Sequence, residues 1–92
     1  MMTKVSGPNH RSKVTLYTLS TCPWCKKTKR LLQENGVAYE FVDVDLVSPA
    51  EEDAVISEIE RLNPMRSFPT IVINGHVIAG FQEAKIREAL GL

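Results

Sequence analysis

Two stretches of the chain have the residue pattern of strands, and an amphipathic segment separates them. Residues 14–18 alternate between the two faces of a strand, and residues 38–44 are rich in β-branched and aromatic residues. Between them, residues 23–35 place apolar side chains at the i, i+3, i+7 spacing of one buried helical stripe, and Asn35-Gly36 supplies a stop signal. A strand, a helix and a strand with short connections predict a right-handed βαβ unit with parallel strands.

The second half of the chain predicts a helix, a hairpin and a final helix. Ser48-Pro49-Ala50-Glu51 has the residues of a helix start with a capping box, and Asn63-Pro64 ends that segment. Two apolar runs flank Asn74-Gly75, a strong signal for a β-hairpin. Residues 82–90 have a short amphipathic pattern. The predicted order is therefore βαβαββα, in the α/β class.

Length, composition and charge limit the classes of function. Of the 92 residues, 43% are hydrophobic and 24% charged, which is ordinary for one globular domain. The formal net charge is zero, so we expect no nucleic-acid or acidic-membrane partner. Residues 1–12 are polar without an apolar targeting segment, and we interpret them as a flexible tail before a domain of residues 13–92. No run is apolar enough to span a bilayer, and we expect a cytoplasmic monomer.

The only two cysteines, Cys22 and Cys25, lie where the first helix is predicted to begin. Positions i and i+3 lie on nearly the same side of a helix start, so the two sulfurs can come within bonding distance. The free N–H groups of the first turn and the helix dipole favour a thiolate at Cys22, and the thiolate is the reactive form. Pro23 suits the first helical position because it lacks an N–H. This pattern indicates redox or metal chemistry in a reducing compartment, and we hypothesise a reversible dithiol–disulfide centre.

Several short motifs, together with the element order, resemble the thioredoxin fold and, more narrowly, glutaredoxin-like redoxins. The resemblance covers residues 13–92 and rests on Tyr17-Thr18, Cys22-Pro23-Trp24-Cys25, Ser67-Phe68-Pro69 and Ala79-Gly80-Phe81. It implies an α/β thioredoxin fold with a four-stranded mixed sheet flanked by helices, and a thiol:disulfide oxidoreductase activity. It also implies that the partner-binding surface comprises Pro23, Trp24, Ser67, Phe68, Pro69, Gly80 and Phe81.

The resemblance also implies a role for each cysteine. Cys22 would be the attacking thiolate that forms a mixed disulfide with a target, and Cys25 would resolve it and leave a Cys22–Cys25 disulfide. No cofactor beyond this dithiol is then needed. Pro69 occupies the position of the family's cis-proline, where the backbone of Phe68 would face Cys22 and pair with an extended substrate segment.

Departures from glutathione-dependent glutaredoxins bear on the reductant. Leu19 stands where those proteins usually carry a lysine, and Gly80-Phe81 replaces a Gly-Gly pair that contacts the amino end of glutathione. Of their acidic pair near the last helix, only Glu83 remains. The Gly-Phe step is closer to NrdH-type redoxins, which are reduced by thioredoxin reductase and serve ribonucleotide reductase. We therefore expect those two proteins as reductant and target, with glutathione as the alternative reductant.

Side chains around the cysteines have both a structural and a functional interpretation. We expect Trp24 at the surface, where Phe68 and Phe81 could join it in an apolar rim for partners, although Phe81 equally suits the core. A basic cluster after the cysteines is either a solvated helix face or a support for the Cys22 thiolate and an acidic partner: Lys26, Lys27, Lys29 and Arg30. Salt screens lysine charges, so Lys26 and Lys27 should support the thiolate less than the helix N–H groups do.

A metal site is the other chemistry open to this cysteine pair. Zinc takes four ligands, and the chain adds only His10 and His76, with no second C-x-x-C. A dimer could supply four thiolates to zinc or an iron–sulfur cluster, so a metal-binding module formed on dimerisation is a distinct alternative. We expect His76 to be solvent-exposed on a strand beside the hairpin turn.

Overall fold

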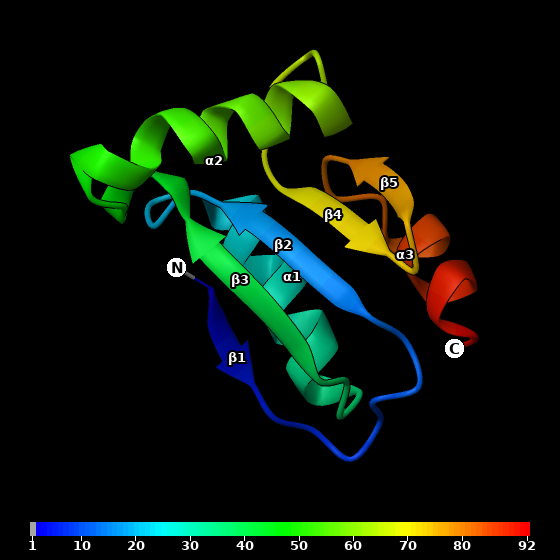
Figure 1. Ribbon diagram of the computed structural model, residues 1–92. Helices are drawn as coiled ribbons and strands as arrows, with labels where there is room; N and C mark the ends of the chain where they lie inside the picture. Colours follow the sequence, from blue (N-terminus) through cyan, green and yellow to red (C-terminus); the bar gives the residue numbers. More distant parts are fainter. Residues whose placement is uncertain (1) are drawn as a thin grey trace.

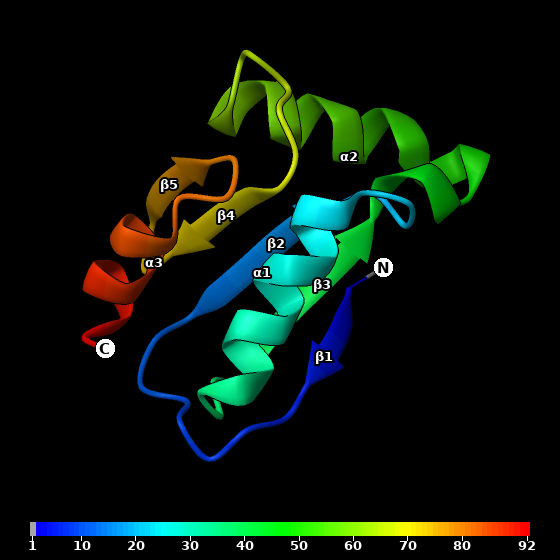
Figure 2. The same ribbon diagram turned by 180° about the vertical axis from the view of Figure 1, so that it is seen from behind.

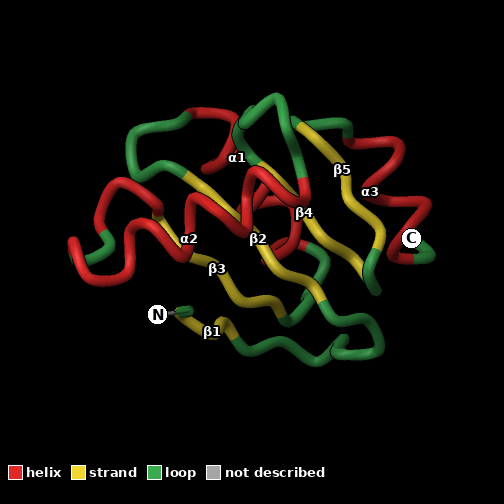
Figure 3. Tube along the Cα trace, turned by 45° about the horizontal axis from the view of Figure 1, so that its top comes forward, coloured by secondary structure: helices red, strands yellow, loops and turns green. Residues whose placement is uncertain are grey.

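A five-stranded sheet with helices on both faces forms the molecule in the computed structural model, which describes residues 2–92 (Figure 1). The strands are β1 (Thr3–Val5), β2 (Val14–Thr18), β3 (Tyr39–Asp43), β4 (Thr70–Ile73) and β5 (His76–Ala79). They lie side by side in the order β1-β3-β2-β4-β5 (Figure 3). The helices are α1 (Pro23–Glu34), α2 (Pro49–Leu62) and α3 (Glu83–Leu90), with a 3-10 helix η1 (Val44–Leu46) after β3.

The central strand β2 pairs with strands of both directions. It runs parallel to β3, with Leu16 opposite Phe41, and antiparallel to β4, with Leu16 opposite Ile71. The parallel pair confirms the predicted βαβ unit. Asn74 and Gly75 turn the chain between β4 and β5 with φ of 50° and 85°, the left-handed conformation that a two-residue hairpin requires. The predicted hairpin is therefore confirmed.

The helices bury their apolar stripes on opposite faces of the sheet. α1 buries Cys25, Thr28, Leu31 and Leu32, the predicted stripe, and its two leucines belong to a core that it shares with α3 (Figure 2). α2 crosses the other face, where Val55 and Ile59 pack in a second core. Because α1 follows β2 directly, its N-terminus lies at the carboxyl end of the central strand, and the two cysteines lie there.

Residues 3–9 are part of the fold, so the prediction of a flexible tail is wrong for them. β1 pairs antiparallel with β3, with Val5 opposite Tyr39, and this pairing gives the sheet five strands instead of the expected four. Further on, the N–H of Asn9 donates to the carbonyl of Gly36 at 2.9 Å. The pairing uses backbone groups at the edge of β3, which a short polar segment does not signal in its side chains.

The start of α2 differs from the predicted capping box. The Ser48 hydroxyl donates to the Glu51 carboxylate at 3.0 Å, whereas a capping serine would accept from the N–H of Glu51. That N–H instead donates to the Ser48 carbonyl at 2.9 Å. Pro49 lies in the first helical turn and Asn63 follows the last, as predicted.

Candidate active site

The two cysteines lie at the start of α1, directly after the loop that follows β2. Cys22 is the N-cap residue, with an extended backbone, and Pro23 lies in the first helical turn. The N–H of Cys25 donates to Sγ of Cys22 at 3.2 Å, so this sulfur takes the place of the usual capping oxygen. The N–H donor and the positive end of the helix dipole both stabilise negative charge on it.

The loop that leads to Cys22 is bound to η1. The Ser20 hydroxyl donates to the carboxylate of Asp45, and the Ser20 N–H donates to Asp45 Oδ1 at 2.8 Å. These hydrogen bonds, chiefly the one from the hydroxyl, lower the pKa of Asp45 from its ordinary value. The N–H of Cys22 donates to the Leu19 carbonyl at 3.1 Å, so the backbone on the N-terminal side of the cysteine is also bound.

Cys25 differs from Cys22 in its access to solvent. It is 0% exposed, whereas Cys22 is partly exposed. Burial, followed by the hydrogen bond with Cys22, raises the pKa of Cys25 to about 12, so this thiol is neutral at ordinary pH. The geometry therefore offers one sulfur to an incoming molecule and keeps the other behind it.

The loop before β4 is held by Asn63, a buried residue that sequence reasoning missed. Its amide donates to the Ser67 Oγ at 2.9 Å, to the Ser67 carbonyl at 3.2 Å and to the Thr70 Oγ1 at 3.1 Å. This loop contains the Phe68–Pro69 peptide bond, which is cis, the isomer found at the family's cis-proline position that Pro69 was expected to occupy. An asparagine before Pro64 signals only a helix stop in the sequence, so its side-chain contacts were not foreseeable.

Gly80 ties the segment after β5 to this proline loop. Its N–H donates to the Pro69 carbonyl at 2.7 Å, and its φ of 80° lies in the region that favours glycine. On the α2 side, the half-buried Phe68 packs against the second core and, with Leu19, lines a mostly apolar pocket of about 250 Å³. The residues expected to surround Cys22 thus come from three separate segments that hydrogen bonds and packing hold in place.

An aromatic ledge, defined here as Trp24, Phe81 and the Lys27 ammonium group above them, lies beside the cysteines. Trp24 is 55% exposed, which confirms its predicted place at the surface. Its ring stacks on Phe81, with centroids 5.7 Å apart and planes inclined by 22°. Phe81 also packs against the first core, which confirms the structural interpretation of this residue, while its place in a rim for partners stays a prediction. The Lys27 Nζ lies 5.2 Å from the Trp24 centroid and 5.4 Å from that of Phe81, contacts worth about 0.5–1 kcal/mol each at an exposed site.

Lys29, which was outside the pair proposed from the sequence, contributes the smallest of the influences on the pKa of Cys25. Lys26 is exposed, and Lys27 lies over the rings of Trp24 and Phe81. The Lys29 Nζ lies 3.3 Å from Asp43 Oδ1, and its charge lowers the pKa of Cys25 against the larger effect of burial. Support of the Cys22 thiolate by Lys26 and Lys27 stays a prediction.

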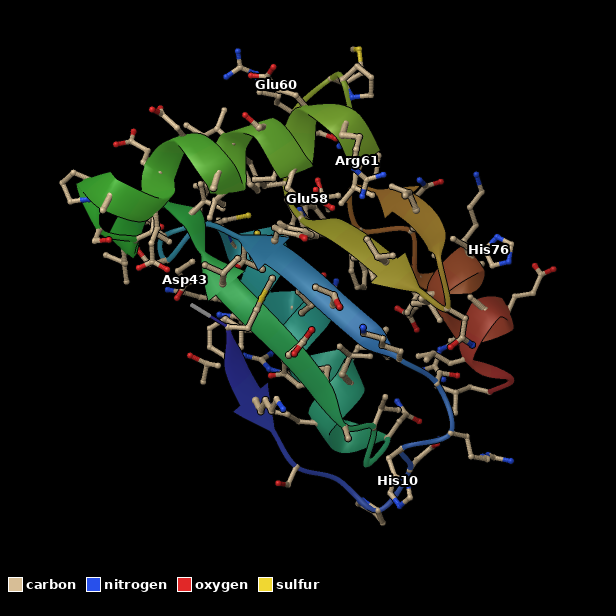
Figure 4. All side chains as sticks on the ribbon, viewed as in Figure 1. His10, Asp43, Glu58, Glu60, Arg61 and His76 are labelled. Carbon is tan, nitrogen blue, oxygen red and sulfur yellow. The ribbon has the colours of Figure 1, made fainter. Side chains whose placement is uncertain are left out.

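Lys29 is fixed by more than its ion pair. Asp43 also accepts a hydrogen bond of 2.6 Å from the buried Thr18 hydroxyl, and the Lys29 Nζ lies 3.8 Å from the ring centroid of Phe41. Figure 4 shows Asp43 at the end of β3, and α1 begins after the same end of the parallel strand β2. This arrangement holds a positive charge one helical turn beyond Cys25.

Residues 2–92 contain no metal-binding cluster and no membrane-spanning helix. No group of three or more His, Cys, Asp or Glu side chains in this part of the chain could hold a metal ion. His10 and His76 are both exposed and lie far apart, His76 on β5 as expected (Figure 4). A metal site shared between two chains stays a prediction. No helix within these residues is long and apolar enough to cross a membrane.

Comparison with known proteins assigns the family. Residues 14–78 match the family model described as Glutaredoxin. This chain belongs to the glutaredoxin family. A glutaredoxin-like 8.6 kDa protein in the rubredoxin operon of Clostridium pasteurianum is 37% identical over 73 residues, which cover 79% of this chain and 91% of that protein. Glutaredoxin from Neisseria meningitidis is 33% identical over 70 residues, covering 76% of this chain and 78% of that protein.

Solved structures agree with the glutaredoxin assignment. Methanoredoxin from Methanosarcina acetivorans is 49% identical with a TM-score of 0.90, covering 98% of this chain and 96% of that one. Glutaredoxin from Methanosarcina mazei is 49% identical with a TM-score of 0.87, covering 99% and 88%. The expected glutaredoxin-like thioredoxin fold is confirmed, with one strand more than predicted. The protein is a thiol:disulfide oxidoreductase of this family, whereas its reductant, its target and the NrdH-type branch stay predictions.

Proposed function

We propose that this glutaredoxin reduces protein disulfides as a dithiol, with Cys22 attacking and Cys25 resolving. One observation carries the proposal: the N–H of Cys25 donates to Sγ of Cys22 at 3.2 Å while the Cys25 side chain itself is 0% exposed. A helix N-terminus that caps an accessible sulfur favours its anionic, nucleophilic form. The second cysteine follows three residues later, a spacing that permits a disulfide between Cys22 and Cys25.

The electrons and protons balance over two displacement steps. The Cys22 thiolate attacks one sulfur of the target disulfide, the target S–S bond breaks, and the departing target thiolate takes a proton. Cys25 then loses its proton and attacks the Cys22 sulfur, which releases the second target sulfur as a thiol. The target has gained two electrons and two protons, and this chain holds a Cys22–Cys25 disulfide that a reductant must open.

The raised pKa of Cys25 is compatible with the second step. Cys22 raises it through their hydrogen bond and through its charge, next to the larger effect of burial. In the mixed disulfide, Cys22 carries neither a proton nor a charge, so both of these effects end. The positive charge of Lys29 still lowers the pKa of Cys25. Deprotonation of Cys25 therefore becomes easier at the stage that requires it.

Thioredoxin reductase is the reductant that the site favours. The target is then a protein disulfide, such as that of ribonucleotide reductase, and the reaction takes place in a reducing compartment such as the cytoplasm. Leu19 supplies no charge at the position where glutathione-dependent relatives carry a lysine. Phe81 stacks on Trp24 where those relatives have a glycine. Glu83, the acidic residue left from their pair, already binds Arg87 at 2.9 Å. These three features weaken recognition of a small charged tripeptide.

The test supplies the purified protein with either thioredoxin reductase and NADPH or glutathione and glutathione reductase, and follows reduction of a protein disulfide. We expect turnover with thioredoxin reductase and little with glutathione. A matched double variant, Leu19→Lys with Phe81→Gly, reinstates the two missing features and should gain turnover with glutathione. Robust turnover of the unaltered chain with glutathione alone would reverse the assignment of the reductant.

A second experiment tests the proposed roles of Cys22 in attack and of Cys25 in resolving the mixed disulfide. Cys25→Ser should lose reduction of protein disulfides and accumulate a mixed disulfide at Cys22, because no second thiol is left to resolve it. Mass spectrometry of the trapped species identifies the bonded residue. If Cys25→Ser turned over protein disulfides at the rate of the unaltered chain, the mechanism would not require a dithiol.

A further inference from the structure

The two long helices carry opposite charges although the chain as a whole has a formal net charge of zero. α1 carries four basic side chains and one acidic one, whereas α2 carries five acidic side chains and one basic one. They lie on opposite faces of the sheet (Figures 1 and 2). A molecule that approaches Cys22 along α1 therefore meets positive charge, and one that approaches along α2 meets negative charge.

Most of the positive charge on α1 has no internal partner. Lys29 pairs with Asp43, but Lys26, Lys27 and Arg30 form no ion pair among residues 2–92. Lys27 is nevertheless held in place, because its ammonium group lies between 5 and 6 Å from the centroids of both Trp24 and Phe81. A side chain held against two rings loses less freedom on meeting a carboxylate than an unrestrained lysine does.

The aromatic ledge combines this charge with apolar surface next to the reactive sulfur. Trp24 lies between the two cysteines in sequence and is 55% exposed, and Phe81 extends its surface toward Gly80, which is bound to Pro69. A segment of a target whose disulfide reaches Cys22 from this side must pass over the ledge. Apolar contact and a carboxylate for Lys27 are the interactions that the ledge can offer.

We propose that the aromatic ledge of Trp24, Phe81 and Lys27 selects target proteins whose disulfide is flanked by a large apolar residue and an acidic residue. The inference rests on the proposed reduction of protein disulfides and specifies its substrates. Trp24 and Phe81 bind the apolar side chain, and Lys27 binds the carboxylate while staying in contact with the rings. Lys27 is then a residue that determines specificity, in addition to any effect on the Cys22 thiolate.

The experiment mixes the reduced full chain with excess of a peptide that contains one internal disulfide, and follows formation of the reduced peptide by acid quenching and chromatography, a readout that does not depend on Trp24. Four peptides of equal length are compared: Leu with Glu beside the disulfide, Leu with Lys, Leu with Gln, and Ser with Glu. The measured quantity is the second-order rate constant of reduction for each peptide. The variants are Lys27→Glu, Trp24→Ala and, as a control with the same change of net charge, Lys13→Glu. Lys13 is exposed at the opposite end of β2 from the cysteines.

We expect the Leu-Glu peptide to react about fivefold faster than the Leu-Lys peptide at low salt, and the difference to shrink as salt is added. Lys27→Glu should invert this order, whereas Lys13→Glu should keep it. Trp24→Ala should abolish the advantage of Leu-Glu over Ser-Glu. Exposure of Trp24 makes misfolding of that variant a minor concern, and an unchanged circular dichroism spectrum checks it.

Three results would overturn the proposal. Equal rates for all four peptides would reject the ledge as a selector and leave the dithiol chemistry intact. Inversion by Lys13→Glu as well as by Lys27→Glu would assign the preference to net charge alone. If the unaltered chain sediments as a dimer and Trp24→Ala sediments as a monomer, a second copy of the chain occupies the ledge. Failure of the unaltered chain to reduce any peptide would instead remove the proposed function itself, and the inference with it.

Discussion

Replacing Cys22 by alanine removes two of the influences that keep Cys25 protonated. In the reduced protein, burial, the hydrogen bond between the cysteines and the charge of Cys22 raise the pKa of Cys25 from 9.0 to about 12. Burial is the largest influence and remains in Cys22→Ala, whereas the other two disappear. We therefore expect the pKa of Cys25 in this variant to lie between those two values.

The magnitude follows from the size of the shift. Three pKa units, from 9.0 to about 12, correspond to roughly 4 kcal/mol in favour of the neutral thiol, at about 1.4 kcal/mol per unit. At pH 7, about one Cys25 side chain in 10⁵ is then ionised in the folded protein, against about one in 10² in the unfolded chain. Cys22→Ala lowers the pKa of Cys25 by removing the hydrogen bond and the charge of Cys22. A mixed disulfide at Cys22 removes the same two influences and should lower the pKa of Cys25 by a similar amount.

The assay is a titration of the Cys25 Cβ resonance in protein labelled at cysteine, compared between the unaltered chain and its variants. Cys22→Ser is the matched control, because its hydroxyl can keep the hydrogen bond but carries no charge, so its midpoint should lie between those of the unaltered chain and Cys22→Ala. The reasoning is refuted if Cys25 of the unaltered chain titrates like an ordinary thiol. An identical midpoint in Cys22→Ala would refute it equally.

Buried polar groups elsewhere lead to two more expectations. Asn63→Ala should lower the free energy of unfolding by about 2–4 kcal/mol, because it leaves the buried partners of the Asn63 amide in the proline loop unsatisfied. Denaturant titration measures this loss, and a loss below about 0.5 kcal/mol would contradict the expectation. Stability should also fall as the pH rises above about 9, because burial raises the pKa of Cys25, Tyr17 and Tyr39 and the unfolded chain therefore loses these protons first. A free energy of unfolding that stays constant or rises between pH 9 and the loss of the fold would contradict the second expectation.

Local patterns were sufficient to predict most of the fold. Residues 14–18 form β2 and residues 70–79 form the β4–β5 hairpin, because alternation and Asn74-Gly75 specify these elements without distant partners. The buried stripe of α1 was likewise predictable from its spacing. The position of Cys22 and Cys25 at the helix start follows from the same local signals, so the centre of the candidate site could be located from the sequence.

Features that depend on distant partners could not be predicted in this way. β1 forms because the edge of β3 offers unpaired backbone groups, and the side chains of residues 3–5 carry no signal of that pairing. The same limit applies to side chains. Lys29 is distinguished from Lys26 and Lys27 by its contacts with Asp43 and Phe41, which come later in the chain. The role of Asn63 likewise depends on the loop after it, which brings the Ser67 hydroxyl within hydrogen-bond distance of its amide.

The central claim is that the cysteines at residues 22 and 25 form one reversible disulfide within a single chain. The most direct measurement equilibrates the protein in thiol–disulfide buffers of increasing oxidising strength, then alkylates the remaining thiols and maps the peptides by mass spectrometry. We expect both thiols to disappear together in one two-electron transition that yields a peptide pair joined through Cys22 and Cys25. Loss of one thiol while the other stays free, or a disulfide that joins two chains, would contradict the claim.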